Sequence, residues 1–424
     1  MDDGRNPVVP LDAAFFADPH ALYARLRVEE PVARAVTPVG LPVWLVTRYD
    51  DVRQALADPR LAKDADGFAR TLDRQPVPSE GRAVFARELN RHMLSSDPPD
   101  HTRLRKLVGR AFTVRAVAGL RPRVEAIAAG LADRMAAGPA EVDLLDAFAV
   151  PLPMSVICEL LGVPEADRTS FRHWSGTLLT SDSAAADRTA AGLAMAGYLT
   201  ALVAEKRARP AGDMLTAIVA ASEDADRLSA DETVAMAFLL LVAGHETTVN
   251  LIGNGALALL RRPDRLAELR ADPGLVPSAV EEFLRLDGPV NLATFRFTSE
   301  PVELGGTTVP AGEVVLVSLA SANRDPDHYP AADELDLRRD AGHLAFGHGI
   351  HHCLGAPLAR LEGEVAFRTL LTRFPDLALA VDPDELTWRQ SILMRGLTRL
   401  PVRLRATDAA AVPVRPAGAT ADTR

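Results

Sequence analysis

The stretch Phe346-Gly347-His348-Gly349-Ile350-His351-His352-Cys353-Leu354-Gly355 carries the densest chemistry of the 424-residue chain. Glycines on both sides of a single cysteine allow the backbone to pass close to something large and flat. A helical pattern over 356–371 begins directly after this stretch. The helix dipole and the unpaired amides at a helix N-terminus favour a thiolate, and an anionic sulfur suits the axial position of an iron ion. We therefore predict that Cys353 ligates a metal.

Two other interpretations of this stretch stay open on the residues alone. A lone buried cysteine most often acts as a small hydrophobic side chain. The chain could also be a non-catalytic metal-binding protein, because five soft or borderline ligands for zinc or copper lie close together. They are His343, His348, His351, His352 and Cys353.

A second segment, 229–262, is predicted to form one long buried helix. Ser229 and Glu232 have the spacing of a capping box at its start, and the helix is apolar nearly all round from 234 to 249. Its middle holds Ala243-Gly244-His245-Glu246-Thr247-Thr248. Glycine costs about 1 kcal/mol relative to alanine in a helix interior, and a buried glutamate is costly without partners. This loss of stability indicates a functional site, whereas the alternative is a kinked core helix with a solvated glutamate.

The rest of the chain reads as mainly helical. Strand patterns are few and cluster at 42–47, 302–304, 307–309 and 313–318. We predict a mainly α fold with a small β region. No Pro/Gly/Ser-rich linker divides the chain, so residues 1–405 are expected to form a single domain, and residues 406–424 a disordered C-terminal tail.

Composition excludes several classes of protein. The chain has 47 basic and 57 acidic residues and a net charge of −10, which argues against nucleic-acid binding. Cys158 and Cys353 are its only cysteines, which fits a reducing cytoplasm better than a secreted disulfide framework. The N-terminus lacks the pattern of a signal peptide. The most apolar run, 233–243, is too short to span a bilayer. We expect a cytoplasmic monomer without membrane contact.

Four motifs resemble those of the cytochrome P450 family of haem-thiolate monooxygenases, in the family's order and over residues 15–404. Together they imply the cytochrome P450 fold, with the long central helix over the haem. They are Asp97-Pro98-Pro99-Asp100-His101-Thr102-Arg103-Leu104-Arg105, similar to the haem-propionate segment of soluble bacterial members; Ala243-Gly244-x-Glu246-Thr247, similar to the oxygen-activating groove; Glu282-x-x-Arg285, similar to a structural ion pair; and Phe346-x-x-Gly349-x-x-x-Cys353-x-Gly355, which matches the haem-binding loop.

The resemblance implies a haem b cofactor with Cys353 as its proximal thiolate ligand. Phe346, Gly349 and Gly355 belong to the same haem-binding loop. Binding should be non-covalent, because the chain has no Cys-x-x-Cys-His motif. The residues expected to hold the haem propionates are His101, Arg105, Arg296 and His351.

The resemblance also assigns roles to the middle of the central helix. Ala243 and Gly244 would line the space over the iron, and Gly244 would leave room for dioxygen. Thr247 would hold a water molecule by hydrogen bond, and Glu246 would relay protons from solvent, which is positioned acid catalysis. A peroxide-driven peroxygenase is a variant of this activity, but the intact Glu246 and Thr247 favour O2.

One motif departs from the family pattern. Many members complete the Glu282–Arg285 pair with an arginine at a position where this chain has Glu334. Arg324 or Arg339 could substitute for that arginine.

No flavin or NAD fingerprint is present, so electrons should come from NAD(P)H through a ferredoxin reductase and a ferredoxin. Segment 100–112 is basic on an acidic protein. We expect an acidic ferredoxin to dock there through Arg103, Lys106 and Arg110. The alternative is a solvated helix face.

The substrate is predicted to be a bulky apolar small molecule. The sequence of residues 240–254 resembles that of actinobacterial enzymes that hydroxylate or epoxidise macrolides and other polyketides in antibiotic biosynthesis. Some relatives accept steroid- or terpenoid-like molecules, which is the alternative substrate class. The residues expected to line the substrate pocket are Leu94, Leu178, Phe238, Leu239, Val242, Val290, Asn291, Leu292, Thr294 and Leu393.

Overall fold

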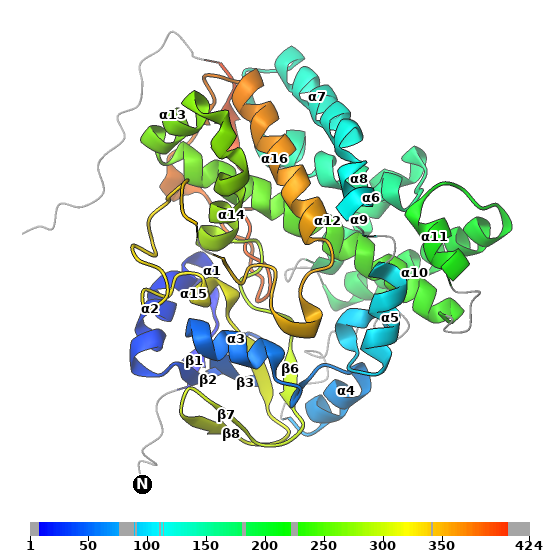
Figure 1. Cartoon of the computed structure of the whole chain (residues 1–424), viewed down its shortest axis with the longest axis vertical. Helices are drawn as coiled ribbons and strands as arrows, with labels where there is room; N and C mark the ends of the chain where they lie inside the picture. Colours follow the sequence, from blue (N-terminus) through cyan, green and yellow to red (C-terminus); the bar gives the residue numbers. More distant parts are fainter. Residues whose placement is uncertain are drawn as a thin grey trace, which may run out of the picture.

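The computed structural model describes residues 8–75, 89, 91–109, 112, 114–179, 184–221, 228–340 and 342–405. Arg110 and the predicted tail at 406–424 therefore lie outside the described residues. Figure 1 shows a large helical part and a smaller part that holds most of the strands. The predicted mainly α fold with a small β region is confirmed.

The helical part is built around the long helix α12 (Ala230–Leu260), which packs most extensively against α8, α10, α14 and α16. Its helices are α5 (Asp100–Gly109), α6 (Val114–Ala118), α7 (Arg121–Ala137), α8 (Pro151–Leu160), α9 (Arg168–Leu179), α10 (Ala185–Ala208), α11 (Met214–Ala221), α13 (Pro263–Ala271), α14 (Val276–Asp287) and α16 (Ala356–Arg373).

Helix α12 begins and ends close to where the sequence pattern predicts. Ser229 accepts a hydrogen bond from the Glu232 amide, and Glu232 accepts one from the Ser229 amide, so the predicted capping box is confirmed. By length and composition α12 alone, among the described helices, could cross a membrane. Its most apolar window is 78% buried inside the protein, as in the core helix of a folded domain.

The smaller part holds a six-stranded sheet in the order β1, β2, β3, β9, β6, β4. These strands are β1 (Val9–Pro10), β2 (Val32–Val36), β3 (Pro42–Val46), β4 (Leu61–Ala62), β6 (Arg296–Thr298) and β9 (Val314–Val317). The helices of this part are α1 (Ala13–Ala17), α2 (Pro19–Glu29), α3 (Tyr49–Ala57), α4 (Ala65–Asp73) and α15 (Leu319–Ala322).

Two further strand groups complete the β structure. The hairpin of β7 (Val302–Leu304) and β8 (Thr307–Val309) matches its predicted bounds. A three-stranded sheet joins β10 (Ala378–Leu379), β11 (Pro401–Arg403) and β5 (Glu141–Asp143), which are far apart in sequence. The loop before α16 lies between the helical part and the large sheet (Figure 1), where its turn at 349–351 contacts α3.

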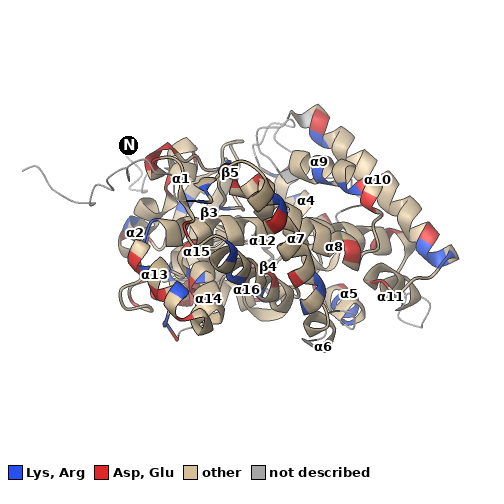
Figure 2. Ribbon diagram, turned by 90° about the horizontal axis from the view of Figure 1, so that it is seen from above, with Lys and Arg blue, Asp and Glu red and all other residues tan. Residues whose placement is uncertain are grey.

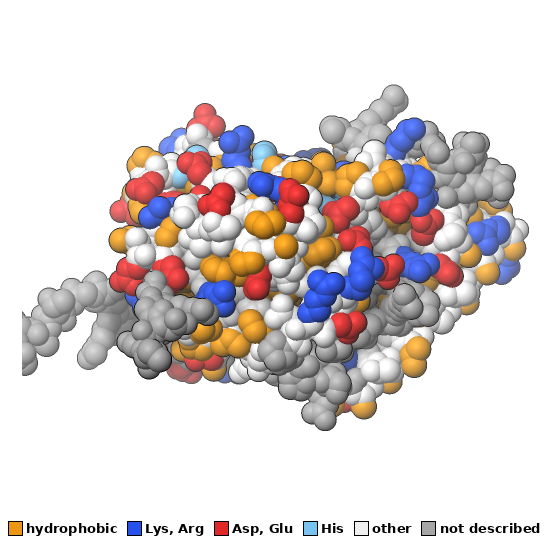
Figure 3. Space-filling view, turned by 90° about the horizontal axis from the view of Figure 1, so that it is seen from below, with side chains coloured by type: hydrophobic (Ala, Val, Ile, Leu, Met, Phe, Trp, Pro, Cys, Tyr) orange, Lys and Arg blue, Asp and Glu red, His pale blue; other side chains and the backbone are white. Residues whose placement is uncertain are grey.

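Charged residues are marked along outer helices such as α10 and α13, whereas α12 passes through the centre (Figure 2). On the face shown in Figure 3, blue and red side chains are interspersed with hydrophobic ones. Opposite charges are therefore mixed on this face.

Candidate active site

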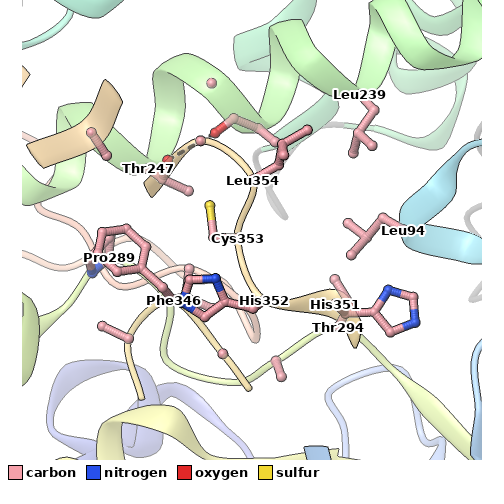
Figure 4. A pocket seen from close by; sticks show the side chains of 18 of the residues that line it. Leu94, Leu239, Thr247, Pro289, Thr294, Phe346, His351, His352, Cys353 and Leu354 are labelled. Atoms are coloured by element: carbon pink, nitrogen blue, oxygen red, sulfur yellow. Dashed lines mark hydrogen bonds between the residues drawn. The ribbon is translucent and has the colours of Figure 1, made fainter. Parts of the chain in front are cut away.

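A cavity of about 270 Å³ separates α12 from the loop that carries Cys353. Figure 4 shows the Cys353 sulfur pointing into this cavity toward α12, with Thr247 on the facing wall. Its lining is predominantly apolar and includes Ile157, Leu240 and Ala293 besides the residues discussed below. An apolar chamber with a sulfur in one wall is a suitable site for a flat, largely apolar cofactor and an apolar substrate.

The Cys353 loop depends on two glycines with left-handed backbone conformations. Gly347 has φ of 72° and Gly349 has φ of 73°. A β-carbon on Gly349 would lie 3.0 Å from the carbonyl oxygen of Leu56, so a larger side chain would force α3 away. The Cys353 amide donates to the Phe346 carbonyl over 2.8 Å, which closes the loop.

Two backbone amides and one guanidinium group influence the protonation of the Cys353 thiol. Burial raises the pKa of the Cys353 thiol, while the backbone amides of Gly355 and Ala356 and the nearby Arg105 act in the opposite direction. These amides belong to the start of α16. The loop thus supplies the helix N-terminus expected for a stabilised thiolate.

A cluster of basic groups lies at one edge of the cavity, where Asp97 acts on Lys63, Arg296 and His101 through its charge. Among the described residues, no acidic side chain forms a salt bridge with the cluster. The rings of His101 and His351 have centroids 4.4 Å apart. Both ring nitrogens of the buried His101, Nε2 of His351 and Nε of Arg296 have no hydrogen-bond partner among the described residues. Burial lowers the pKa of Arg296 to about 10, and burial together with Lys63 lowers the pKa of His351 to about 2. Buried donors without partners are rare in proteins, so this edge fits the two carboxylates of a haem.

Lys63 is a member of this cluster that sequence reasoning did not identify. Its Nζ donates to Thr294 Oγ1 over 2.6 Å, and burial and the charge of Arg296 lower the pKa of Lys63 well below its ordinary value. The only signal in the sequence is that lysine is rare in this chain, since Lys63 is one of three lysines.

Arg105 has a different local role, since its Nη2 donates to the His352 carbonyl over 2.6 Å and so ties α5 to the Cys353 loop.

On the opposite wall, α12 presents Ala243, Gly244 and Thr247 to the cavity. The Thr247 hydroxyl donates to the Ala243 carbonyl over 2.9 Å, so its lone pairs remain to accept a hydrogen bond. A β-carbon on Gly244 would lie 3.1 Å from Cδ1 of Ile157, so the space beside this glycine is bordered by α8.

Glu246 does not line the cavity. It is buried behind the wall, where its carboxylate forms an ion pair with Arg389, and its Oε2 lies 3.8 Å from His245 Nε2. The sequence reasoning did not anticipate Arg389, which lies 143 positions further along the chain.

Four of the ten residues expected in the substrate pocket line the cavity, namely Leu94, Leu239, Val290 and Thr294. The other six are not among the residues that line this cavity. Phe238 and Val242 each come one position before a residue of α12 that lines the cavity, so their side chains point about 100° away from it. Phe238 and Leu178 belong to the helical core, and Val242 packs against that core. Leu292 and Leu393 pack with the N-terminal helices and the sheet, and Asn291 accepts a hydrogen bond from the Tyr23 hydroxyl over 2.8 Å.

Glu282 and Arg285 form a buried bidentate ion pair with two N···O distances of 2.7 Å. Arg339 occupies the third corner, because its Nε lies 3.2 Å from the Glu282 carboxylate. Arg324 instead donates to the Leu286 carbonyl over 2.6 Å. Glu334 joins this cluster through its backbone carbonyl, which accepts from Arg285 over 3.1 Å and from Arg339 over 3.5 Å.

The basic face expected on α5 is altered by an ion pair. Arg103 pairs with Glu232 at the start of α12 and with Asp100, so its charge is partly neutralised. Lys106 is exposed on α5.

The alternative zinc or copper site is not formed by the described part of the chain, which holds no group of three or more His, Cys, Asp and Glu side chains suited to a metal ion. His343 instead lies 3.2 Å from Glu281.

Comparisons with known proteins agree with this geometry. A family profile described as Cytochrome P450 matches residues 195–401. Cytochrome P450 107B1 of Saccharopolyspora erythraea is 54% identical over 95% of this chain and 99% of its own length. Vitamin D(3) 25-hydroxylase of Pseudonocardia autotrophica is 54% identical over 92% of this chain and 94% of its own length.

Among solved structures, the tirandamycin C-bound P450 monooxygenase TamI superimposes with a TM-score of 0.87 and 52% identity, over 94% of this chain and all of TamI. A similarity of this extent, with a cysteine facing the long helix across an apolar cavity, leaves one assignment: the chain belongs to the cytochrome P450 family and is a haem-iron monooxygenase.

Proposed function

We propose that this monooxygenase inserts one atom of O2, by hydroxylation or epoxidation, into a bulky apolar natural product. A macrolide or another polyketide is the substrate class that we favour. The observation that carries the proposal is the Cys353 sulfur facing Thr247 across an apolar cavity whose edge holds unpartnered basic groups. TamI, which has been solved with tirandamycin C bound, supports a substrate of this size.

The cofactor that fits the site is a non-covalent haem b. Cys353 would ligate its iron, and the basic cluster at the cavity edge would hold its propionates by charge-assisted hydrogen bonds. When bound, the haem supplies the activation of dioxygen and the oxidation of the substrate. The members of this cluster are Lys63, His101, Arg105, Arg296 and His351.

The chain's own residues supply positioning and protons. Apolar side chains such as Leu94, Leu239 and Val290 orient the substrate and exclude water from the cavity. The Thr247 hydroxyl, which is directed by its bond to the Ala243 carbonyl, accepts a hydrogen bond from a water molecule in the cavity. Glu246 holds and passes protons from the solvent side.

We infer that electrons come from NAD(P)H through a ferredoxin reductase and a ferredoxin. Lys106 on α5, together with Arg110 of the sequence, would attract an acidic partner, whereas Arg103 would contribute less because Glu232 pairs with it. We further propose a monomer in the cytoplasm, which agrees with two cysteines that both occur as free thiols.

The first test of the proposal is the absorption spectrum of the purified protein after reduction with dithionite and exposure to carbon monoxide. Wild-type protein should show the strongly red-shifted Soret band of a thiolate-ligated haem, and Cys353→Ser should lose it completely. Cys158→Ser is the matched control, because Cys158 is buried in α8 away from the cavity. A band at the position of histidine-ligated haem in the wild type, or its survival in Cys353→Ser, would contradict the assignment of the ligand.

A second candidate substrate class is steroid- or terpenoid-like molecules, which the 54% identical relative named Vitamin D(3) 25-hydroxylase favours. Optical titration of the holoenzyme with vitamin D3, tirandamycin C and a macrolactone separates the classes. The compound that shifts the Soret band most completely at the lowest concentration identifies the better substrate class. Turnover supported by hydrogen peroxide alone, at the rate reached with O2 and a ferredoxin, would instead favour the peroxygenase variant.

A further inference from the structure

Glu246 and Thr247 are neighbours in sequence but lie on opposite sides of the cavity wall. Thr247 lines the cavity, whereas the Glu246 carboxylate is buried behind it and forms an ion pair with the Arg389 guanidinium. The Glu246 side chain is 8% exposed and that of Arg389 is 30% exposed. Arg389 therefore extends from the solvent to a buried carboxylate one residue away from the cavity.

The other group in contact with this carboxylate does not supply a positive charge. Burial lowers the pKa of His245, so the imidazole is neutral at physiological pH. Its Nδ1 lies 2.8 Å from the Leu241 carbonyl, which can only accept, so Nδ1 carries the proton. Nε2 then carries no proton and lies 3.3 Å from the Ser175 hydroxyl, which donates to the Arg172 carbonyl over 3.2 Å. Within the described residues, Arg389 is thus the cation that directly contacts Glu246.

The backbone that carries Arg389 is held firmly. The Arg389 amide donates to the Gly396 carbonyl over 2.9 Å, which closes a loop within residues 388–397. Asn254 of α12 donates from Nδ2 to the Arg395 carbonyl over 3.0 Å, and the Arg395 amide donates to the Pro289 carbonyl over 2.8 Å. Because the loop is bonded both to α12 and to the cavity wall, the backbone that carries the Arg389 guanidinium is fixed relative to Glu246.

We propose that Arg389 is a positioning residue for proton delivery, which holds the Glu246 carboxylate in place at the solvent end of a proton route that ends at Thr247. A proton from solvent binds one carboxylate oxygen of Glu246 and weakens the ion pair with Arg389. The same proton then leaves to a water molecule on the Thr247 side, so Glu246 is again a carboxylate and pairs with Arg389. One proton enters and one leaves per cycle, and no electrons are exchanged. This inference rests on the proposed monooxygenase function.

The experiment compares wild-type holoenzyme with Arg389→Gln and Arg389→Lys, with Arg399→Gln as the matched control because Arg399 is an exposed arginine nearby. The reaction uses NADPH, a ferredoxin and its reductase, O2 and tirandamycin C as the probe ligand. The readouts are kcat and KM for NADPH consumption from pH 6 to 9, the solvent isotope effect on kcat, and the melting temperature.

Arg389→Gln should lower kcat by about tenfold near pH 6.5 and leave KM within about twofold. The loss is smaller than the roughly 10²–10⁴-fold contribution of a positioned acid or base, because Glu246 itself is still present. The loss should shrink as the pH rises, because a buried carboxyl without its counter-charge keeps its proton to a higher pH and only the ionised form accepts one. The solvent isotope effect should increase. Arg389→Lys should restore most of kcat, and Arg399→Gln should match the wild type.

The outcomes separate the two proposals. Arg389→Gln with the wild-type pH profile and isotope effect, or with a loss that is equal at every pH and follows a lower melting temperature, overturns the role of Arg389 alone. A wild-type protein without a thiolate-type carbon monoxide band overturns the proposed function, and the inference with it.

Discussion

Two buried clusters of basic side chains in this protein differ in how their donors are used. Around Glu282, the guanidinium of Arg285 makes two bonds to the carboxylate and further bonds to the carbonyls of Asn323 and Ala332 over 2.9 and 2.7 Å. At the cavity edge, His101 is equally buried, yet neither ring nitrogen has a partner among the described residues.

The difference shows that a buried group of charged side chains can either stabilise the fold or bind a ligand. Leaving a buried donor unpaired costs about 1–3 kcal/mol, so a folded protein tolerates a group of such donors where a ligand supplies the missing acceptors. A cluster that satisfies itself, such as Glu282–Arg285, stabilises the fold and needs nothing else. We therefore expect substitutions in the first cluster to destabilise the protein without cofactor, and substitutions in the second to weaken cofactor binding.

Arg285→Ala should have the largest effect on stability. It leaves the Glu282 carboxylate buried beside Arg339 alone, and breaking a buried ion pair costs about 3–5 kcal/mol. We expect most of the protein to be insoluble, or its melting temperature in the haem-free form to fall by about 4–6 degrees. Thermal unfolding by circular dichroism measures this, with His101→Ala as the comparison. Equal loss of stability in the two variants would contradict the distinction between the clusters.

Lys63→Met should have effects of opposite sign on the haem-free and haem-bound protein. A buried lysine without a carboxylate partner opposes folding, so the variant without haem should be more stable by about 1 kcal/mol. With haem, loss of a propionate donor should weaken binding by about tenfold. Haem transfer to apomyoglobin measures the affinity, and urea unfolding of the haem-free form measures the stability. Arg70→Met, in α4, is a control outside the cavity.

The pH dependence of the haem-free protein tests the same residue. Burial lowers the pKa of Lys63 in the folded state, so the unfolded chain binds more protons than the folded one at pH values between the lowered pKa and about 10.4. The free energy of unfolding should therefore rise with pH over this window. Lys63→Met should remove this part of the slope, and an unchanged slope would show that Lys63 is not the group responsible.

The sequence predicted those parts of the site that local patterns determine. The glycine spacing around Cys353, the capping box at Ser229 and the hairpin of β7 and β8 depend on residues within a few positions of one another. Lys63, Arg389 and Arg339 meet their partners across 57 to 231 positions, so only the folded chain brings them together.

Sequence patterns identified only some of the residues that line the cavity, and the reason again lies in tertiary structure. A helix pattern identifies α12 as buried all round, but it does not say which of its buried faces borders a cavity. Leu239 and Ala243 face the cavity and Phe238 faces the core because of how α12 is rotated against α8 and α10. That rotation is set by tertiary packing, not by the periodicity of α12 itself.

Arg339→Ala should have the smallest of these effects and would sharpen the comparison most. Arg339 adds a third charge to a carboxylate that Arg285 already satisfies, and its side chain is 10% exposed, compared with 1% for Glu282. Its removal leaves no buried charge unpaired, so we expect a loss of about 1 kcal/mol, measured by urea unfolding, and an unchanged carbon monoxide spectrum. Arg338→Ala is the control, because Arg338 pairs with Glu268 on the surface. A loss as large as that of Arg285→Ala would mean that the Glu282 carboxylate needs both cations, and that the cluster is satisfied only as a set of three.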